Sequence, residues 1–282
     1  MEYIFLLAVI ILVSLQSVFK KQYNSNSESP SSFTYSCLTS VAALFVFCVI
    51  SCFKLSFTSS IVPYSIAFAV AFASAMAGSF FAIKYGTLSI TILVTSYSLI
   101  IPTFYGVFAL GDTIGKLGII GLILLFISIF LINIKKEKIR VNTKWIISLI
   151  FAFVGNGMCS LIQKLQQLKF DGEYKSEFMI LALTICSVIF VFLAVLTKEK
   201  PLKDAKVLFS SASLCGISNG IVNYLVMVLT ALIPNVILFP AISAGGIALG
   251  FFFALFIYKE RLNKIQYIGY FIGTASIILL NI

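Results

Sequence analysis

The chain contains an internal repeat, with one copy at the end of its first half and the other at the end of its second half. Residues 112–134 read DTIGKLGIIGLILLFISIFLINI and residues 260–282 read ERLNKIQYIGYFIGTASIILLNI. Aligned without a gap at an offset of 148, the copies share eight residues: Lys116/Lys264, Ile120/Ile268, Gly121/Gly269, Ser128/Ser276, Ile129/Ile277, Leu131/Leu279, Asn133/Asn281 and Ile134/Ile282. Each copy begins with a carboxylate, Asp112 or Glu260, ahead of an apolar segment. A repeat of this kind restricts the fold to two halves of similar construction.

The composition predicts that these halves lie in a membrane. Hydrophobic residues make up 60% of the chain, charged residues only 11%, and the mean hydropathy is +1.09. A soluble domain carries about 25% charged residues. The charges cluster between apolar runs that are long enough to cross ~30 Å of hydrocarbon as helices. The net charge of +10 comes mainly from short loops, where basic residues set membrane orientation, so it does not indicate nucleic-acid binding.

Apolar runs separated by turn formers predict ten transmembrane helices. Their expected ranges are 3–22, 33–54, 61–85, 87–110, 113–134, 144–168, 176–197, 205–231, 233–258 and 262–282. The basic linker 135–143 separates a first five-helix repeat, 1–134, from a second, 144–282. The first helices of the two halves also correspond at an offset of 143, through Ser17/Ser160 and Lys21/Lys164. Because five is odd, the second half starts on the opposite side of the membrane. The predicted fold class is therefore an all-α membrane protein with ten transmembrane helices arranged as two inverted five-helix repeats.

Several positions in both halves resemble one transporter family. The residues that carry the resemblance are Pro102, Gly106, Gly111-Asp112 and Gly121 in the first half, and Gly250, Lys259-Glu260 and Gly269 in the second. Together with the helix count, they are similar to the EamA-like branch of the drug/metabolite transporter superfamily. The chain departs from the family at Asp112, where Glu is usual, and at Lys259, where Gly is usual. The resemblance implies a permease or exporter, with helices one to four and six to nine around a central cavity and helices five and ten at the periphery or a dimer face.

Uncharged polar residues near the middle of the helices are the candidates for lining such a cavity. They are Gln16, Tyr97, Asn156, Gln163, Asn219, Asn223 and Tyr224. An unpaired amide is costly in hydrocarbon, so these side chains are expected to face the protein interior. Hydrogen bonding between helices without any substrate contact would satisfy the same requirement. Their concentration in corresponding helices favours a polar binding cavity.

Two prolines and the two repeat-end acids are further candidates. Pro102 and Pro240 interrupt helices four and nine, where a proline removes a backbone hydrogen bond and kinks the helix. Such kinks favour a cavity lining, although plain packing kinks are the alternative. Asp112 and Glu260 stand at helix starts, where a carboxylate accepts backbone N–H groups. We interpret them as helix caps, with substrate or ion contact as the alternative.

Lysines and cysteines carry weaker indications. Lys20, Lys21, Lys84 and Lys164 lie near helix ends, where such side chains usually extend to the lipid headgroups, and they could also bind an anionic substrate. The six cysteines form no CxxC pair and the chain has no histidine, which argues against a transition-metal site. No nucleotide-binding motif or nucleophile–base pair is present, so we expect no enzyme activity and no cofactor. All ten acids are expected in loops or at helix ends, which argues against proton coupling by a buried carboxylate.

The sequence thus favours a multi-pass secondary transporter that moves a small polar metabolite, such as an amino acid, across the cytoplasmic (plasma) membrane by alternating access. A lipid or lipid-linked sugar flippase and a non-transporting membrane scaffold are the alternatives. The expected partners are the small-molecule substrate and the lipid bilayer, in a monomer or homodimer.

The distribution of basic residues predicts the orientation of the chain. Fifteen of its 20 Lys and Arg residues fall in or beside the odd-numbered connections, which places linker 135–143 in the cytoplasm and both termini outside. A Lys138→Cys variant in intact cells should therefore resist an impermeant maleimide and react after permeabilisation, as measured by mass spectrometry of the labelled peptide. Reaction in intact cells would reverse the orientation.

Overall fold

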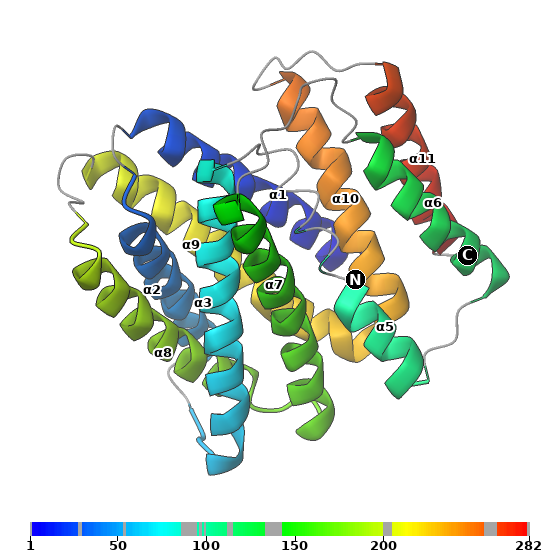
Figure 1. The fold of residues 1–282 in the computed structure, drawn as a ribbon. Helices are drawn as coiled ribbons and strands as arrows, with labels where there is room; N and C mark the ends of the chain where they lie inside the picture. The colour runs from blue at the N-terminus through cyan, green and yellow to red at the C-terminus, as the bar shows by residue number, and fades with distance from the viewer. Residues whose placement is uncertain are drawn as a thin grey trace.

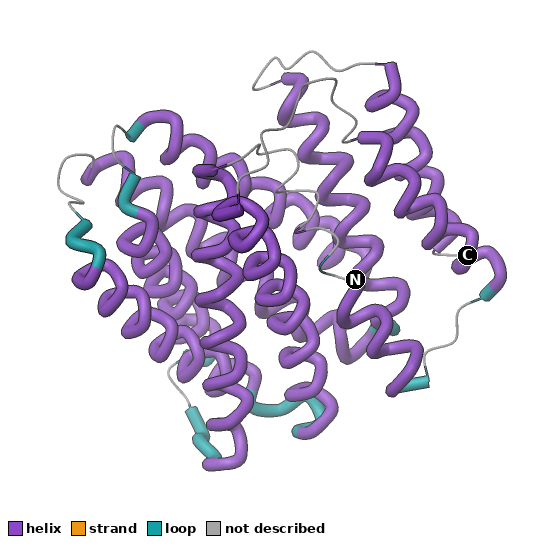
Figure 2. The backbone as a smooth tube through the Cα atoms, in the orientation of Figure 1, coloured by secondary structure: helices purple, strands orange, loops and turns teal. Residues whose placement is uncertain are grey.

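The computed structural model describes residues 2–27, 30–52, 55–85, 95, 98, 100–111, 115–132, 143–199, 205–256 and 264–280. Every regular element in these ranges is helical (Figures 1 and 2). With the labels of Figure 1, the elements are α1 (Glu2–Asn26), α2 (Ser32–Ile50), the 3-10 turn η1 (Ser59–Ile61), α3 (Val62–Tyr85), α5 (Ile100–Ala109), α6 (Lys116–Ile132), α7 (Thr143–Lys169), α8 (Lys175–Leu196), α9 (Ala205–Leu232), α10 (Asn235–Phe256) and α11 (Lys264–Leu280).

Six of the described helices are long and apolar enough to cross a membrane. They are α1, α2, α3, α7, α8 and α9, and α6 and α10 contain shorter apolar stretches. Large apolar side chains such as Phe45, Val188 and Phe192 are exposed on their outer faces. A soluble protein would not leave so many such residues in water. The helical architecture is therefore compatible with a multi-pass membrane protein.

Helices from the two ends of the chain pack against each other instead of forming separate domains. The most extensive contacts join α3 to α7, α6 to α11, α1 to α9, and α2 to both α8 and α9. Each of these pairs combines a helix before residue 134 with one that starts at residue 143 or later. The helices α6 and α11 lie side by side at one edge, where α11 also contacts α10 (Figure 1). The core is consequently shared between the two halves of the sequence.

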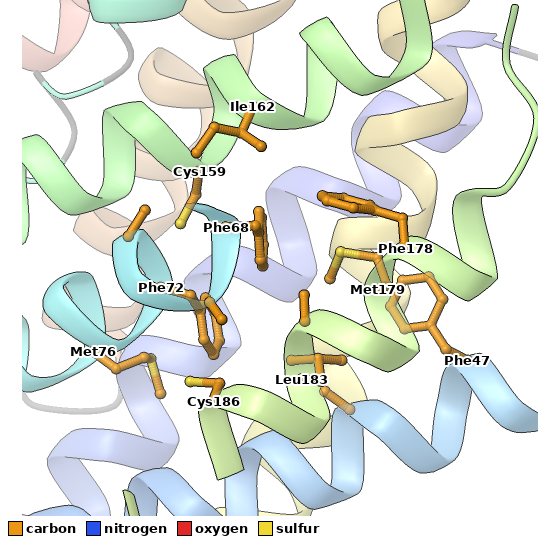
Figure 3. Packing of buried hydrophobic residues seen from close by; sticks show 14 of the residues in the cluster. Phe47, Phe68, Phe72, Met76, Cys159, Ile162, Phe178, Met179, Leu183 and Cys186 are labelled. Carbon is orange, nitrogen blue, oxygen red and sulfur yellow. The ribbon is translucent and has the colours of Figure 1, made fainter. Parts of the chain in front are cut away.

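The largest buried cluster shows how this sharing is achieved. Side chains of α2, α3, α7, α8 and α9 meet in one apolar region, part of which is drawn in Figure 3. Phe68 on α3 packs edge-to-face on Phe178 on α8, with ring centroids 5.4 Å apart, and Phe47 on α2 packs on Tyr224 on α9 at 6.2 Å. Aromatic pairs of this geometry add to the dispersion energy of the buried rings.

Glycines allow α3 and α7 to cross at very short distance. A Cβ atom on Gly78 would lie 2.5 Å from the backbone nitrogen of Ala152, and one on Gly155 would lie 2.5 Å from the nitrogen of Ala75. Each helix therefore presses its backbone against a glycine of the other. Close approach of this kind supplies van der Waals contact where lipid offers no hydrophobic driving force. Any side chain at Gly78 or Gly155 would force the helices apart.

Two further glycine contacts join other helix pairs. Gly216 and Gly220 on α9 face the backbone of α2, and Gly273 on α11 faces the Oγ atom of Ser128 on α6. The same Ser128 hydroxyl donates to the carbonyl of Gly269 at 2.7 Å. Gly246 on α10 differs from these, because a Cβ atom added there would meet no atom within 4 Å. Close packing therefore does not explain why residue 246 is a glycine.

Two glutamates, one in the first turn of α8 and one just after α8, bond α2 and the connection that follows it. Glu199, just after α8, accepts the backbone N–H groups of Phe33 at 2.9 Å and Thr34 at 2.8 Å, and the Thr34 hydroxyl at 2.8 Å. These backbone groups belong to the first turn of α2, whose N-cap residue makes no side-chain cap bond. At the other end, Glu177 accepts the backbone N–H of Ser56 at 3.0 Å. Carboxylates thus join one end of α8 to the first turn of α2 and the other end to the connection between α2 and η1.

We predict that the Glu199 contact contributes measurably to stability. Glu199→Ala would leave the N–H groups of Phe33 and Thr34 without their acceptor and should lower the free energy of unfolding by about 1–3 kcal/mol. The measurement is the unfolding midpoint of the purified protein in detergent. Glu173→Ala, which removes an exposed carboxylate from the loop at the opposite end of α8, is the matched control. Equal midpoints for the two variants would contradict the assigned role of Glu199.

Candidate functional site

Four of the amide residues expected inside the protein form one continuous chain of hydrogen bonds. Gln163 Nε2 on α7 donates to Asn223 Oδ1 on α9 at 2.7 Å. Asn223 Nδ2 donates to Asn219 Oδ1 and to the Asn219 carbonyl oxygen, each at 2.9 Å. Asn219 Nδ2 then donates to Gln16 Oε1 on α1 at 3.1 Å. We call Gln16, Asn219, Asn223 and Gln163 the amide chain; it joins three helices.

The helical period explains why these residues meet. Asn219 and Asn223 are four residues apart, so they lie one above the other on the same face of α9. Both are buried, as is Gln163, while Gln16 is half-buried. The two ends of the amide chain, Gln16 Nε2 and Gln163 Oε1, make no hydrogen bond to another described residue. A donor and an acceptor therefore remain for a polar ligand.

Asn156 lies on the inner face of α7 and yet is exposed. Its neighbour Gly155 packs on α3, and a Cβ atom on Gly157 would lie 2.6 Å from the carbonyl oxygen of Ser98, which precedes α5. Because successive helical residues turn by about 100°, Asn156 points between these two contacts, on the same side as Gln163 two turns later. An exposed side chain on a packed face is the reason to place a candidate cavity beside Asn156.

The remaining candidates lie outside the amide chain. The ring of Tyr224 packs on Phe47 of α2 and is half-buried in the apolar cluster. Tyr97, Asp112 and Glu260 fall outside the described residues, as do residues 135–142 of the linker. The structure therefore brings Gln16, Gln163, Asn219 and Asn223 together, directs Asn156 to the same side, and places Tyr224 against α2.

The structure describes the surroundings of the two prolines to different extents. Pro240 lies inside α10, as the sequence predicted. Pro102 is buried and lies in the described span of α5, and most of the residues between 86 and 99 fall outside the described ranges. The Pro102 carbonyl accepts Asn235 Nδ2 from the start of α10 at 3.4 Å. Helix four, expected over 87–110, is thus described mainly in its final part.

Two lysines turn inward, contrary to the expectation that they extend to headgroups. Lys20 Nζ on α1 lies 3.7 Å from Met76 Sδ on α3, and Met76 is buried. Lys164 Nζ on α7 donates to the carbonyl of the buried Thr230 on α9 at 2.5 Å. Sequence analysis named both residues but could not establish their direction, because a lysine near a helix end can extend either way.

Comparisons with known proteins identify the arrangement of helices and nothing finer. No family model and no curated protein sequence matches the chain. A solved crystal structure of a protein superposes on 99% of this chain and 95% of its own length, with a TM-score of 0.75 and 11% sequence identity. At that identity the similarity shows the fold alone. The helical arrangement of this chain is therefore one that an experimentally determined protein also adopts.

The exposure of Asn156 on an inner face predicts water in the cavity. In an Asn156→Cys variant, the new thiol should react with a charged methanethiosulfonate reagent at least about tenfold faster than the thiol of Val154→Cys, because only a hydrated thiol ionises readily. Val154 is the matched control, since it is exposed two residues away on the outer face of α7. The rates are measured by mass spectrometry of the α7 peptide in reconstituted protein. Equally slow labelling of both variants would contradict a water-filled cavity.

Proposed function

We propose that the protein is a secondary transporter of a small polar metabolite, built from two inverted five-helix halves. In this arrangement a two-fold axis in the membrane plane exchanges α1 with α7, α2 with α8, α3 with α9, α5 with α10, and α6 with α11. Inverted halves can exchange conformations, which opens one central site to alternate sides of the membrane. The ten transmembrane helices and the location in the plasma membrane are part of this proposal.

The pattern of helix contacts supports the inverted halves. Under the proposed exchange, the contact of α3 with α7 becomes that of α9 with α1, and the contact of α2 with α9 becomes that of α8 with α3. The contact of α1 with α10 becomes that of α7 with α5. The exchange maps three contacting pairs onto themselves, namely α2–α8, α5–α10 and α6–α11. All of these contacts are present, as two-fold symmetry requires.

Individual residue contacts support the same exchange. A shift of 143 converts the pair Thr34 and Glu199 into Glu177 and Ser56, and both pairs are hydrogen-bonded. The offsets of 143 and 148 convert Ser14 and Gly246 into Gly157 and Ser98. The Ser14 hydroxyl lies 3.5 Å from the Gly246 carbonyl oxygen, and Gly157 faces the Ser98 carbonyl oxygen.

The amide chain is the single observation that supports transport best. It joins α1 of the first half to α7 and α9 of the second, beside the inner face on which Asn156 is exposed. Amides are uncharged donors and acceptors that suit a polar metabolite, and they can exchange partners between the protein and a ligand at little net cost. A scaffold that does not transport would need no exposed amide inside its helix bundle, which favours transport over that alternative.

Counterflow tests this proposal. Proteoliposomes loaded with unlabelled L-serine, L-glutamine or L-glutamate should take up the matching radiolabelled amino acid for at least one of the three. Asn219→Leu, which breaks the amide chain at its centre, should reduce the initial rate by about tenfold or more, because a lost ligand-linked hydrogen-bond network is worth at least about 1.4 kcal/mol.

The control for counterflow is Ser65→Ala, which removes a buried hydroxyl bonded to Phe178 on the far side of the apolar cluster. This variant should retain wild-type exchange. An imposed pH gradient should leave the exchange rate unchanged, because the described acids Glu2, Asp171, Glu173, Glu177 and Glu199 all lie at helix ends or in loops. Absence of exchange for all three amino acids, combined with scrambling of a fluorescent lipid, would instead indicate a flippase.

A further inference from the structure

Lys20 places a positive charge inside the helix bundle, next to the amide chain. Its Nζ atom contacts the buried Met76 Sδ on α3 and lies within electrostatic reach of the buried Cys215 thiol on α9. Gln16, one turn earlier on the same face of α1, bonds Asn219, and Cys215 is one turn from Asn219 along α9. Lys20 is therefore the next inward-facing residue after the end of the amide chain.

The described helices around Lys20 supply no acidic side chain to balance its charge, and the carboxylate of Glu199, after α8, is bonded to the first turn of α2. The described spans of α3, α7, α9 and α10 contain no Asp or Glu, and α1 contains only Glu2 at its far end. Within the described part of the chain, the partner of Lys20 Nζ is a thioether, which is a weak acceptor. The other lysine turned inward, Lys164, donates to the carbonyl of Thr230 near the far end of α9 and so does not share the surroundings of Lys20.

A cation without a counter-ion is costly inside an apolar helix bundle. Charged side chains inside membrane segments normally pair with one another or line a pathway for an ion or substrate. The first option is missing on the described helices packed around Lys20, and the exposed Asn156 is the reason to place a candidate cavity at the inner face of α7. A negatively charged group that entered this cavity would supply the missing partner and would form a charge-assisted hydrogen bond with Nζ.

We propose that the cavity binds a small organic anion, whose carboxylate or phosphate group pairs with Lys20 while its polar remainder bonds the free Nε2 of Gln16, at the end of the amide chain next to Lys20. This inference rests on the proposed transport function and narrows its substrate to an anionic metabolite.

Thermal shift of the full-length protein tests the charge requirement with three pairs of probes. Each pair couples an anion to a neutral analogue: L-glutamate with L-glutamine, succinate with succinamide, and glycerol 3-phosphate with glycerol. At least one anion should raise the unfolding temperature, since a ligand that binds only the folded state stabilises it, and its neutral analogue should not. The protein is held in uncharged detergent without anionic lipid, so a lipid headgroup cannot supply the anion.

Variants of two adjacent lysines identify which residue binds the anion. Lys20→Gln should weaken the apparent affinity for that anion by about tenfold or more, whereas Lys20→Arg should retain most of it. Glutamine is a well-matched replacement, because Gln163 occupies the corresponding position in the second half at the offset of 143. Lys21→Gln makes the same change in net charge one residue away and should leave the affinity unchanged. Unfolding temperatures without ligand show whether each variant is folded.

The outcomes separate this inference from the proposed function. Stabilisation by a neutral analogue to the same extent as by its anion, with no effect of Lys20→Gln, would contradict the anion site. A wild-type protein that none of the three anions stabilises would also contradict it. If an anion binds through Lys20 and yet shows no counterflow, the anion site is supported and the transport function is contradicted. Counterflow of a neutral compound that Lys20→Gln does not slow would support transport and contradict the anion site.

Discussion

The pairing of polar groups inside an apolar environment is the constraint on which the rest of this structure depends. In hydrocarbon, every backbone and side-chain polar group must find its partner within the protein. The helices satisfy most of their backbone groups locally, and the chain meets the rest of this requirement in part across its two halves. Glu199 satisfies the first turn of α2 from a position 165 residues away, and Asn219 satisfies Gln16 from 203 residues away. Because these partners are distant in sequence, neither half can satisfy its polar groups alone, and the halves must interpenetrate.

Close helix approach makes that interpenetration possible. At the crossing of α3 and α7, Gly78 and Gly155 each admit the backbone of the opposite helix. On another face, α7 approaches α9, where Gln163 reaches Asn223 directly. The glycines thus fix α7 of the second half against α3 of the first, and the amide chain joins that same α7 to α9 and α1.

The sequence predicted the local features of the fold well and the long-range ones poorly. The expected helix 144–168 is observed as Thr143–Lys169, because apolar length and terminal polar residues define a membrane helix locally. The inward direction of Gln16, Gln163, Asn219 and Asn223 was also predictable, since an amide avoids lipid wherever its partner lies. Their mutual pairing, the cap by Glu199 and the inward turn of Lys20 were not, because each depends on which helices become neighbours.

The chemical asymmetry of the cavity has a consequence for how a substrate would bind. Under the proposed exchange of halves, Gln163 corresponds to Lys20, and their partners are Asn223 on α9 and Met76 on α3. One half therefore contributes an amide pair where the other contributes a cation beside a thioether. A symmetric scaffold with identical chemistry at both ends would bind an asymmetric metabolite in two orientations. Here the charged end and the amide end differ, so under the proposed function a metabolite with one anionic group would be held in a single orientation while the halves exchanged conformations around it.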